Sequence, residues 1–234
     1  MINKSRILIG LGNEIKKSTV TDFKKGDVSR MYLDYLNRKY NFDEWIKLSN
    51  INSYICEKND IILIKPIISI FDKNGFLIKN ILNYLNYEDT KNVCIVIPDF
   101  YRPVGKYKYK SYVKIHEKLG SDFYNVLNSN IINNLNNCDY LQLCFGINNL
   151  QKQEKKSIPS NFLESIDEHE YKIFLKTFEL ADEYFNKKIL NSNYITTNYI
   201  QFKKKYSAME PQKHFKKDTS KRRYILDIYK HMYK

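Results

Sequence analysis

Three short apolar runs along the chain suit buried strands, and helical patterns separate them. The runs are Ile7–Ile9, Asn92–Ile97 and Tyr140–Ile147. Between and after them, apolar residues recur every three or four positions over 28–40, 76–85, 122–135 and 162–190, the last with a possible break near Asp167. Buried strands that alternate with helices predict an α/β fold in which the helices flank a twisted sheet.

Further strands are predicted beside these runs. Ser53–Cys56 and Asp60–Lys65 form a pair of strands joined by Lys58-Asn59. The run Lys106–Lys110 alternates lysine with tyrosine, which predicts a strand with lysines on one face and tyrosines on the other. Pro98 predicts the end of the strand Asn92–Ile97, because proline cannot donate a ladder hydrogen bond.

Charge divides the chain into two parts. Its 234 residues suit one α/β domain with an appendage, and the formal net charge is +13. The segment 203–234 holds eleven Lys or Arg residues against three acidic residues, a net charge of +8. We therefore expect a folded domain over residues 1–202, with a mixed twisted sheet flanked by helices, and a basic C-terminal extension over residues 203–234.

Excess positive charge favours a polyanionic partner, either nucleic acid or an anionic membrane surface. The alternative is that lysine is simply the common surface residue of an AT-rich genome. No apolar stretch reaches the roughly 18 residues of a membrane span. Cys56, Cys94, Cys138 and Cys144 form no C-x-x-C pair, which predicts free thiols in a reducing compartment, and we expect no metal and no cofactor.

Basic residues in two places of the chain could bind a nucleic acid. Lysines on a strand can follow phosphates, and Tyr107, Tyr109 and Tyr112 could stack on unpaired bases; the alternative is an edge strand protected from aggregation by its lysines. The predicted RNA-binding residues are Lys106, Lys108, Lys110, Lys203, Lys204, Lys205, Lys213, Lys216, Lys217, Lys221, Arg222 and Arg223.

Five motifs resemble those of bacterial-type peptidyl-tRNA hydrolases, in the same order. Residues 7–13 are similar to the first strand of that family, which ends in G-L-G-N-P-G, and 61–66 to its L-L-x-K-P strand. The other matches are 98–106 with its D-D-L-D-L-P-x-G-K turn, 140–147 with F-x-R-L-R-I-G-I, and 198–200 with N-R-F. The resemblance covers about residues 5–202 and implies the family's fold.

The resemblance also implies a site for ester hydrolysis, in which a histidine oriented by a carboxylate activates water. The family's T-R-H-N motif falls on Asp22–Asp27, which has no histidine, and the first histidine of the chain is His116. The orienting carboxylate falls on Pro98, beside Asp99, and the asparagine of K-P-x-x-x-M-N falls on Phe71, beside Asp72. The loop G-G-H-N-G falls on 115–120, which has no asparagine, so Asn13 alone remains of the family's site.

These departures predict a pseudoenzyme: a non-catalytic, RNA-binding ribosomal protein with no catalytic residues. We expect it in the mitochondrial matrix without a visible cleavable presequence, in contact with rRNA and neighbouring ribosomal or ribonucleoprotein proteins. An active hydrolase with a relocated base such as His116, next to Glu117 and Asp122, is one alternative. A group II intron splicing cofactor and a scaffold that binds only proteins are two others.

Overall fold

The structure is a computed structural model that describes residues 6–13, 23–67, 73–112, 130–135, 140–148 and 162–186. Contacts between Cα atoms divide the chain into a unit over residues 1–184 and a second unit over 185–234. The fold and the site below belong to the first unit. The predicted boundary between residues 202 and 203 lies outside the described residues and stays a prediction.

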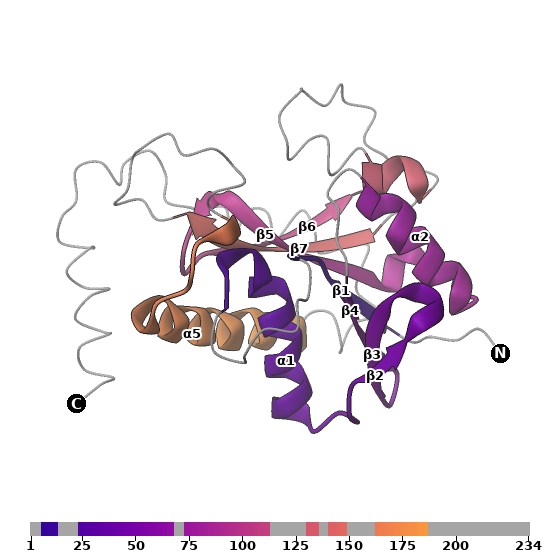
Figure 1. Ribbon diagram of the computed structural model, residues 1–234, viewed down its shortest axis with the longest axis horizontal. Helices are drawn as coiled ribbons and strands as arrows, with labels where there is room; N and C mark the ends of the chain where they lie inside the picture. The colour runs from indigo at the N-terminus through magenta and orange to yellow at the C-terminus, as the bar shows by residue number, and fades with distance from the viewer. Residues whose placement is uncertain are drawn as a thin grey trace. The chain divides into compact units, whose positions relative to one another are not determined.

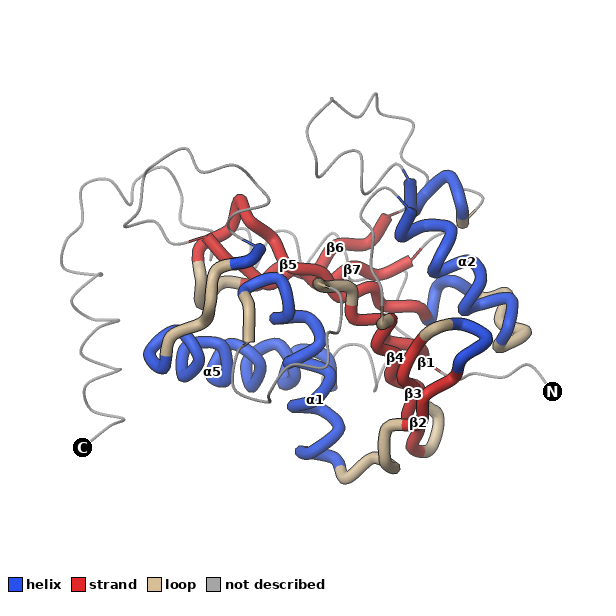
Figure 2. The backbone as a smooth tube through the Cα atoms, in the orientation of Figure 1, coloured by secondary structure: helices blue, strands red, loops and turns tan. Residues whose placement is uncertain are grey.

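A mixed sheet of seven strands forms the centre of the first unit, in the order β2-β3-β4-β1-β5-β7-β6. The strands are β1 (Arg6–Gly10), β2 (Ile46–Leu48), β3 (Ser53–Lys58), β4 (Ile61–Pro66), β5 (Val93–Pro103), β6 (Tyr107–Tyr112) and β7 (Tyr140–Asn148). The four central strands β4, β1, β5 and β7 run parallel, whereas β2, β3 and β6 pair antiparallel on the outside. The predicted α/β fold with a mixed sheet is confirmed, and Figure 2 shows the strands gathered between the helices.

Helices α1 (Val28–Tyr40) and α5 (Glu168–Tyr184) pack against each other on one side of the sheet (Figure 1). Lys39 Nζ on α1 donates to Asp182 Oδ2 on α5 at 2.7 Å, and the rings of Tyr35 and Phe178 meet with centroids 5.9 Å apart. Helix α2 (Asn74–Tyr84) lies apart from this pair, beside the helical residues 130–134. The α1 bounds agree with the predicted 28–40, and α5 begins one residue after the predicted break at Asp167.

Aromatic rings fill the core between this helix pair and the sheet. Tyr32 of α1, Phe145 of β7 and Phe178 of α5 are fully buried, and their centroids lie 4.9–5.4 Å apart. Burying such large side chains contributes roughly 2–3 kcal/mol each. Cys56, Cys94 and Cys144 are buried thiols that form no disulfide within the described residues, as predicted, while Cys138 lies outside those residues.

The prediction that β5 ends before Pro98 is wrong. The strand continues to Pro103, and Pro98 pairs with Phe145 of β7. The reason is that the pairing of β5 with β1 ends at Val96. At Pro98, β7 is therefore the only strand that pairs with β5 in the described part of the chain. A strand with one free side tolerates proline.

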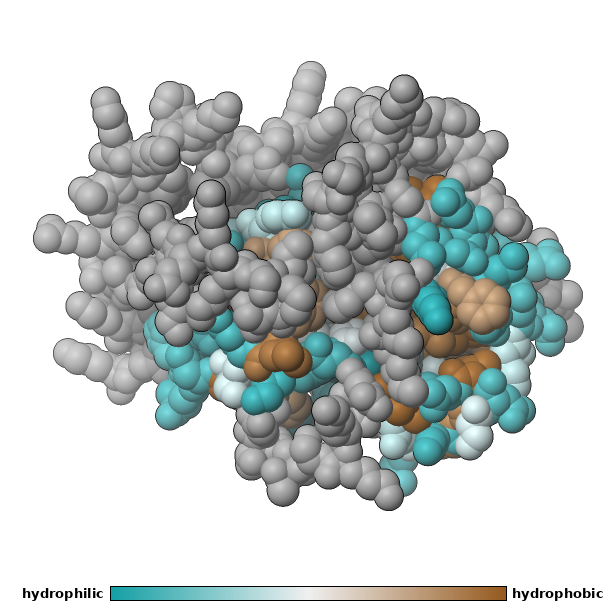
Figure 3. Space-filling view, turned by 45° about the horizontal axis from the view of Figure 1, so that its top comes forward, coloured by the Kyte–Doolittle hydropathy of each residue, from teal (hydrophilic) through white to brown (hydrophobic). Residues whose placement is uncertain are grey.

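The surface of the described residues is mixed in character. Ile46, Phe76 and Leu163 are each more than half exposed. In Figure 3 the hydrophobic residues of the described part lie in separate patches between hydrophilic ones. Within the described ranges, no helix is both long enough and apolar enough to cross a membrane.

Candidate functional site

The turn Gly10–Asn13 follows β1 at the carboxyl ends of the central parallel strands. Its Leu11 N–H donates to Val96 O of β5 at 2.9 Å, which ties the turn to the neighbouring strand. In sheets of this kind, ligands bind outside the carboxyl ends of the parallel strands. The position of Asn13 at this edge therefore makes it the starting point for a candidate site.

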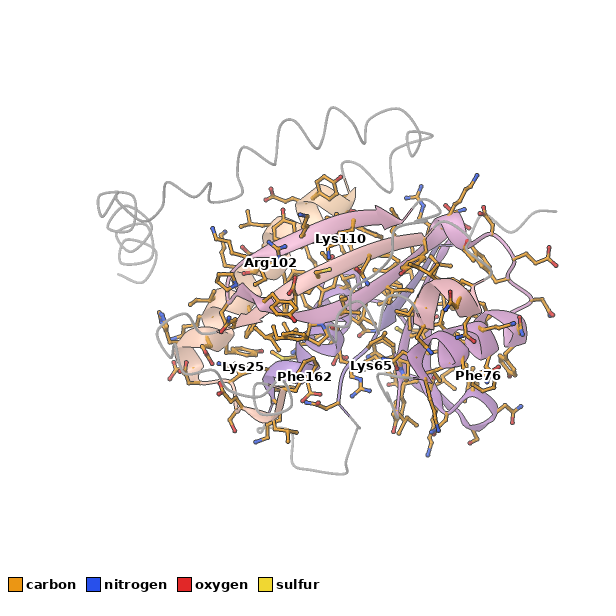
Figure 4. The ribbon with its side chains drawn as sticks, turned by 90° about the horizontal axis from the view of Figure 1, so that it is seen from above. Lys25, Lys65, Phe76, Arg102, Lys110 and Phe162 are labelled. Carbon is orange, nitrogen blue, oxygen red and sulfur yellow. The ribbon has the colours of Figure 1, made fainter. Side chains whose placement is uncertain are left out.

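Asn13 is held by a segment that lies far away in the sequence. Its side-chain Nδ2 donates to Phe162 O at 3.0 Å, across 149 positions. Phe162 is buried, and its ring centroid lies 6.1 Å from that of Phe100 on β5. Figure 4 labels Phe162 and Lys25 near each other, below the strands of the sheet. The segment that begins at Phe162 thus fixes the Asn13 amide.

The short 3-10 turn η1 (Lys25–Asp27) presses directly against the β1 turn. A Cβ atom placed on Gly26 would overlap the side-chain amide of Asn13. A Cβ atom placed on Gly12 would lie 2.6 Å from Gly26 O, closer than real Cβ contacts allow. Because Gly12 and Gly26 have no side chains, the β1 turn and η1 can touch at this point. The next side chain of η1 after Gly26 is that of Asp27.

Asp27 presents a mostly buried carboxyl group next to Asn13. Its side chain is 21% exposed, Oδ2 accepts the Lys24 N–H at 3.1 Å, and Oδ1 lies 3.7 Å from Arg30 Nη1. Burial raises the pKa of Asp27, and hydrogen bonds from Lys24 and Asn13 and the charge of Arg30 oppose that rise. The result is a carboxylate that binds protons more readily than an exposed aspartate does.

Arg30 lies beneath this carboxylate, in the first turn of α1. It is buried, and its Nη2 donates to Pro66 O at the end of β4, at 2.5 Å. Its Nε and Nη1 have no hydrogen-bond partner in the described part of the chain. Burial lowers the pKa of Arg30 to about 10, which leaves it charged at neutral pH. Buried donors of this kind normally bond to protein, water or a ligand.

Lys25 of η1 forms a buried ion-pair network with Glu164 and Glu170. Lys25 Nζ lies 3.0 Å from Glu164 Oε2 and 2.8 Å from Glu170 Oε1, and the lysine side chain is 3% exposed. Burial alone lowers the pKa of Lys25, but the hydrogen bonds to Glu170 and Glu164 outweigh it and raise the pKa. The Lys25 N–H also donates to Glu164 O at 2.8 Å. The segment 162–170 therefore positions both Asn13 and η1.

The other family positions fall into two groups. Asp99, next to Pro98, is 4% exposed; it accepts the Tyr101 N–H at 3.0 Å and pairs with Arg102 Nε at 3.2 Å. It is therefore engaged by its own strand. The positions outside the described residues are Phe71, Asp72, His116, Glu117 and Asp122.

The strand predicted over Lys106–Lys110 is confirmed as β6, which begins one residue later, so that Lys106 lies just before it. Tyr107 and Tyr109 donate their hydroxyls to Leu180 O and Ala181 O of α5, each at 3.2 Å, so the tyrosines face α5. Lys106, Lys108 and Lys110 alternate with them. Because Tyr109 is 9% exposed, its proposed stacking on RNA bases is wrong. The predicted RNA-binding residues outside the described part are Lys203, Lys204, Lys205, Lys213, Lys216, Lys217, Lys221, Arg222 and Arg223.

Sequence reasoning missed three residues of this site: Lys25, Asp27 and Arg30. A signal for one of them was present, since an aspartate directly before the predicted helix 28–40 is a common helix-start residue. No local pattern marks the buried pairing of Lys25 with Glu170, because the partners are far apart in the sequence.

Comparison with known proteins identifies similar sequences and folds. A family profile described as Peptidyl-tRNA hydrolase matches residues 7–209. The chain is similar to a peptidyl-tRNA hydrolase solved in complex with N-propanol, at 15% identity and a TM-score of 0.57, over 76% of this chain and 85% of that one. It is also similar to the peptidyl-tRNA hydrolase of Acinetobacter baumannii, at 13% identity and the same TM-score and coverage. No curated protein matches the chain in sequence.

These matches correct one prediction. The profile and both solved structures are those of hydrolases, which are enzymes, so the prediction of a protein that is not an enzyme is wrong. The resemblance on which the predicted fold rested is confirmed.

Proposed function

Because the chain belongs to the peptidyl-tRNA hydrolase family, we propose that it hydrolyses the ester bond between a peptide and a tRNA. The observation that carries the proposal is the match over residues 7–209, which includes every described residue of the site. Asn13 lies at the carboxyl ends of the parallel strands with its amide fixed by Phe162 O. In this role, the Asn13 side chain orients the substrate or the attacking water.

Binding of the tRNA is supported by charge. The net charge of the chain is +13, and Lys108 and Lys110 alternate along β6 with the tyrosines that face α5, with Lys106 just before the strand. Same-face residues on a strand lie about 6.6 Å apart, and lysines in such a row can follow the phosphates of an RNA strand. Contacts to phosphates carry no sequence information and therefore bind RNA of any sequence, which suits an enzyme that acts on many tRNAs.

The test is release of peptide from a peptidyl-tRNA by the purified full-length chain. We expect saturable release that deacylated tRNA inhibits and that weakens as salt rises. The variant Lys172→Gln should release peptide at the wild-type rate, because it changes an exposed lysine of α5 that is paired with Glu168. Release no faster than in buffer, from protein that still binds the tRNA, would contradict the proposed activity.

A second role is favoured by the charge of +8 on residues 203–234. We propose that this basic extension anchors the protein to rRNA, in a mitochondrial ribosome. Segments with many basic residues bind polyanions readily. The native protein should then sediment with ribosomal subunits in high salt. Sedimentation free of ribosomes, or with intron RNA, would contradict this second role.

Replacing Lys203, Lys204 and Lys205 by glutamine is expected to flatten the salt dependence of RNA binding. Each phosphate contact contributes roughly −0.7 to −0.9 to the slope of log K against log salt, so three lost contacts remove roughly 2 to 3 units. The measurement is RNA affinity at several salt concentrations. The double replacement of Lys172 and Lys176, which pair with Glu168 and Glu179 on α5, is the control. An unchanged slope for the triple variant excludes these lysines from the RNA contact.

A further inference from the structure

Ester hydrolysis at neutral pH is accelerated by a group that takes a proton from the attacking water. The stretch that aligns with the family's histidine motif, 22–27, contains no histidine. The structure brings the end of this stretch, Gly26 and Asp27, into contact with Asn13. The group that replaces the imidazole can therefore be sought among the side chains that touch Asn13.

Among the described carboxylates near the carboxyl ends of the central strands, Asp34 is paired with Lys65 at 2.6 Å, and Asp99 and Asp27 differ in two ways. Asp99 is 4% exposed, and its two oxygens are engaged by the Tyr101 N–H and by Arg102. Asp27 is 21% exposed at its side chain, and hydrogen bonding from Asn13 lowers the pKa of its carboxyl group. Water can reach the Asp27 carboxylate, while the Lys24 N–H holds one of its oxygens, Oδ2, at 3.1 Å. Asp27 is thus the better placed of the two to act on a water molecule.

We infer that Asp27 is the proton acceptor of this site, an inference that rests on the proposed hydrolysis. A proton passes from water to the Asp27 carboxylate while the water oxygen bonds to the ester carbonyl carbon. The bond from that carbon to the ribose oxygen then breaks, and the ribose oxygen takes the proton from Asp27. The products are a peptide with a free carboxyl group and a tRNA with a free hydroxyl, and Asp27 returns to its ionised form.

The surroundings of Asp27 adjust its basicity in opposite directions. Burial raises its pKa, which makes it a stronger base than an exposed aspartate. The charged group that faces it in the described part of the chain is Arg30, with Nη1 at 3.7 Å from Oδ1, and this charge lowers the pKa. The other contacts of the carboxyl group are neutral: the Lys24 N–H and Asn13. Removing the Arg30 charge should therefore raise the pKa of Asp27 further.

The principal test replaces Asp27 by asparagine, which keeps the size and an acceptor oxygen for the Lys24 N–H but is not a base. We expect kcat for peptidyl-tRNA hydrolysis to fall roughly 10²- to 10⁴-fold, with unchanged affinity for deacylated tRNA. The wild-type rate should fall in acid as Asp27 is protonated, and this acid limb should be missing in Asp27→Asn. The matched control is Asp89→Asn, because Asp89 likewise accepts a backbone N–H, from Lys91, ahead of a 3-10 turn.

Thermal stability distinguishes a catalytic Asp27 from an Asp27 that only supports the fold. The pKa of Asp27 is raised in the folded state. Proton binding to Asp27 therefore stabilises the folded protein fully at pH values below the ordinary aspartate pKa of 3.8. This stabilisation is lost as the pH rises through the folded-state pKa. At pH 7 the ionised Asp27 carboxylate therefore lowers the free energy of unfolding. Thermal unfolding of Asp27→Asn should show a stability at pH 7 equal to or above that of the wild type.

Arg30→Met provides a second, independent readout. It should move the acid limb of the rate profile to higher pH, because the positive charge that opposes protonation of Asp27 is gone. A wild-type rate retained by Asp27→Asn, or an acid limb that does not move in Arg30→Met, overturns the assignment of Asp27. A wild-type protein that binds tRNA but releases no peptide overturns the proposed hydrolysis itself, so the two failures are distinguishable.

Discussion

Replacing Lys25 by methionine is expected to lower the free energy of unfolding by about 3–5 kcal/mol. The lysine side chain is 3% exposed and lies 3.0 Å from Glu164 and 2.8 Å from Glu170, which is 9% exposed at its side chain. Methionine fills a similar volume but leaves two carboxylates without their counter-charge, one of them buried. The loss is large because an uncompensated buried charge costs far more than an exposed ion pair contributes.

Urea unfolding followed by circular dichroism measures this loss. The matched control is Lys172→Met, since Lys172 and Glu168 form an exposed pair on α5 whose loss should cost less than about 1 kcal/mol. Adding Glu164→Gln and Glu170→Gln to Lys25→Met should restore much of the stability, because the unpaired charges are then removed. Because the pKa of Lys25 is raised, its stabilising charge is fully present below the ordinary lysine pKa of 10.5 and is lost only as the pH rises through the higher folded-state pKa. Equal losses for Lys25→Met and Lys172→Met would contradict the network.

Replacing Gly146 by alanine is expected to destabilise the fold by about 3 kcal/mol. A Cβ atom on Gly146 would overlap the carbonyl oxygen of Pro103, which is backbone and cannot rotate away. The Gly146 N–H also donates to Lys106 O at 2.8 Å, at the point where the pairing of β5 and β7 shifts register. The added methyl group must therefore push the strand end of β5 or the start of β6 out of place.

The control for this clash is Gly10→Ala in the same sheet. There the nearest atom to an added Cβ is Leu33 Cδ1, at 2.9 Å, the far end of a side chain, and the nearest backbone atom is Ser29 O, at 3.2 Å. Comparing the urea midpoints of the two variants separates a backbone clash from a side-chain clash. A loss in Gly146→Ala no greater than that in Gly10→Ala would show that β5 and β7 yield easily at this point.

Local pattern was sufficient for most of the fold. The helical spacing of 28–40 agrees with α1, and the apolar runs at Ile7–Ile9 and Tyr140–Ile147 lie within β1 and β7. Strand β2 was missed because it has three residues and an exposed Ile46, too short a segment for an alternation to be recognised. The continuation of β5 past Pro98 was missed because it depends on which neighbours the strand has there, and sequence alone does not give them.

The site could be predicted only in part. The glycine turn after an apolar run placed Asn13 at a strand end, but the bond from Asn13 to Phe162 O spans 149 positions and leaves no local pattern. The expectation of a protein that is not an enzyme rested on the missing histidine between residues 22 and 27. That same stretch carries a partly buried carboxylate, Asp27, whose contact with Asn13 depends on the close approach of two glycine-containing turns.

The most direct measurement is single-turnover cleavage of a peptidyl-tRNA by the full-length protein in water labelled with heavy oxygen, followed by mass spectrometry. If water activated in this site attacks the ester carbonyl carbon, the released peptide carries one labelled oxygen in its new carboxyl group and the tRNA carries none. Peptide that remains attached to the tRNA at an enzyme concentration well above that of the substrate would contradict the proposed hydrolysis.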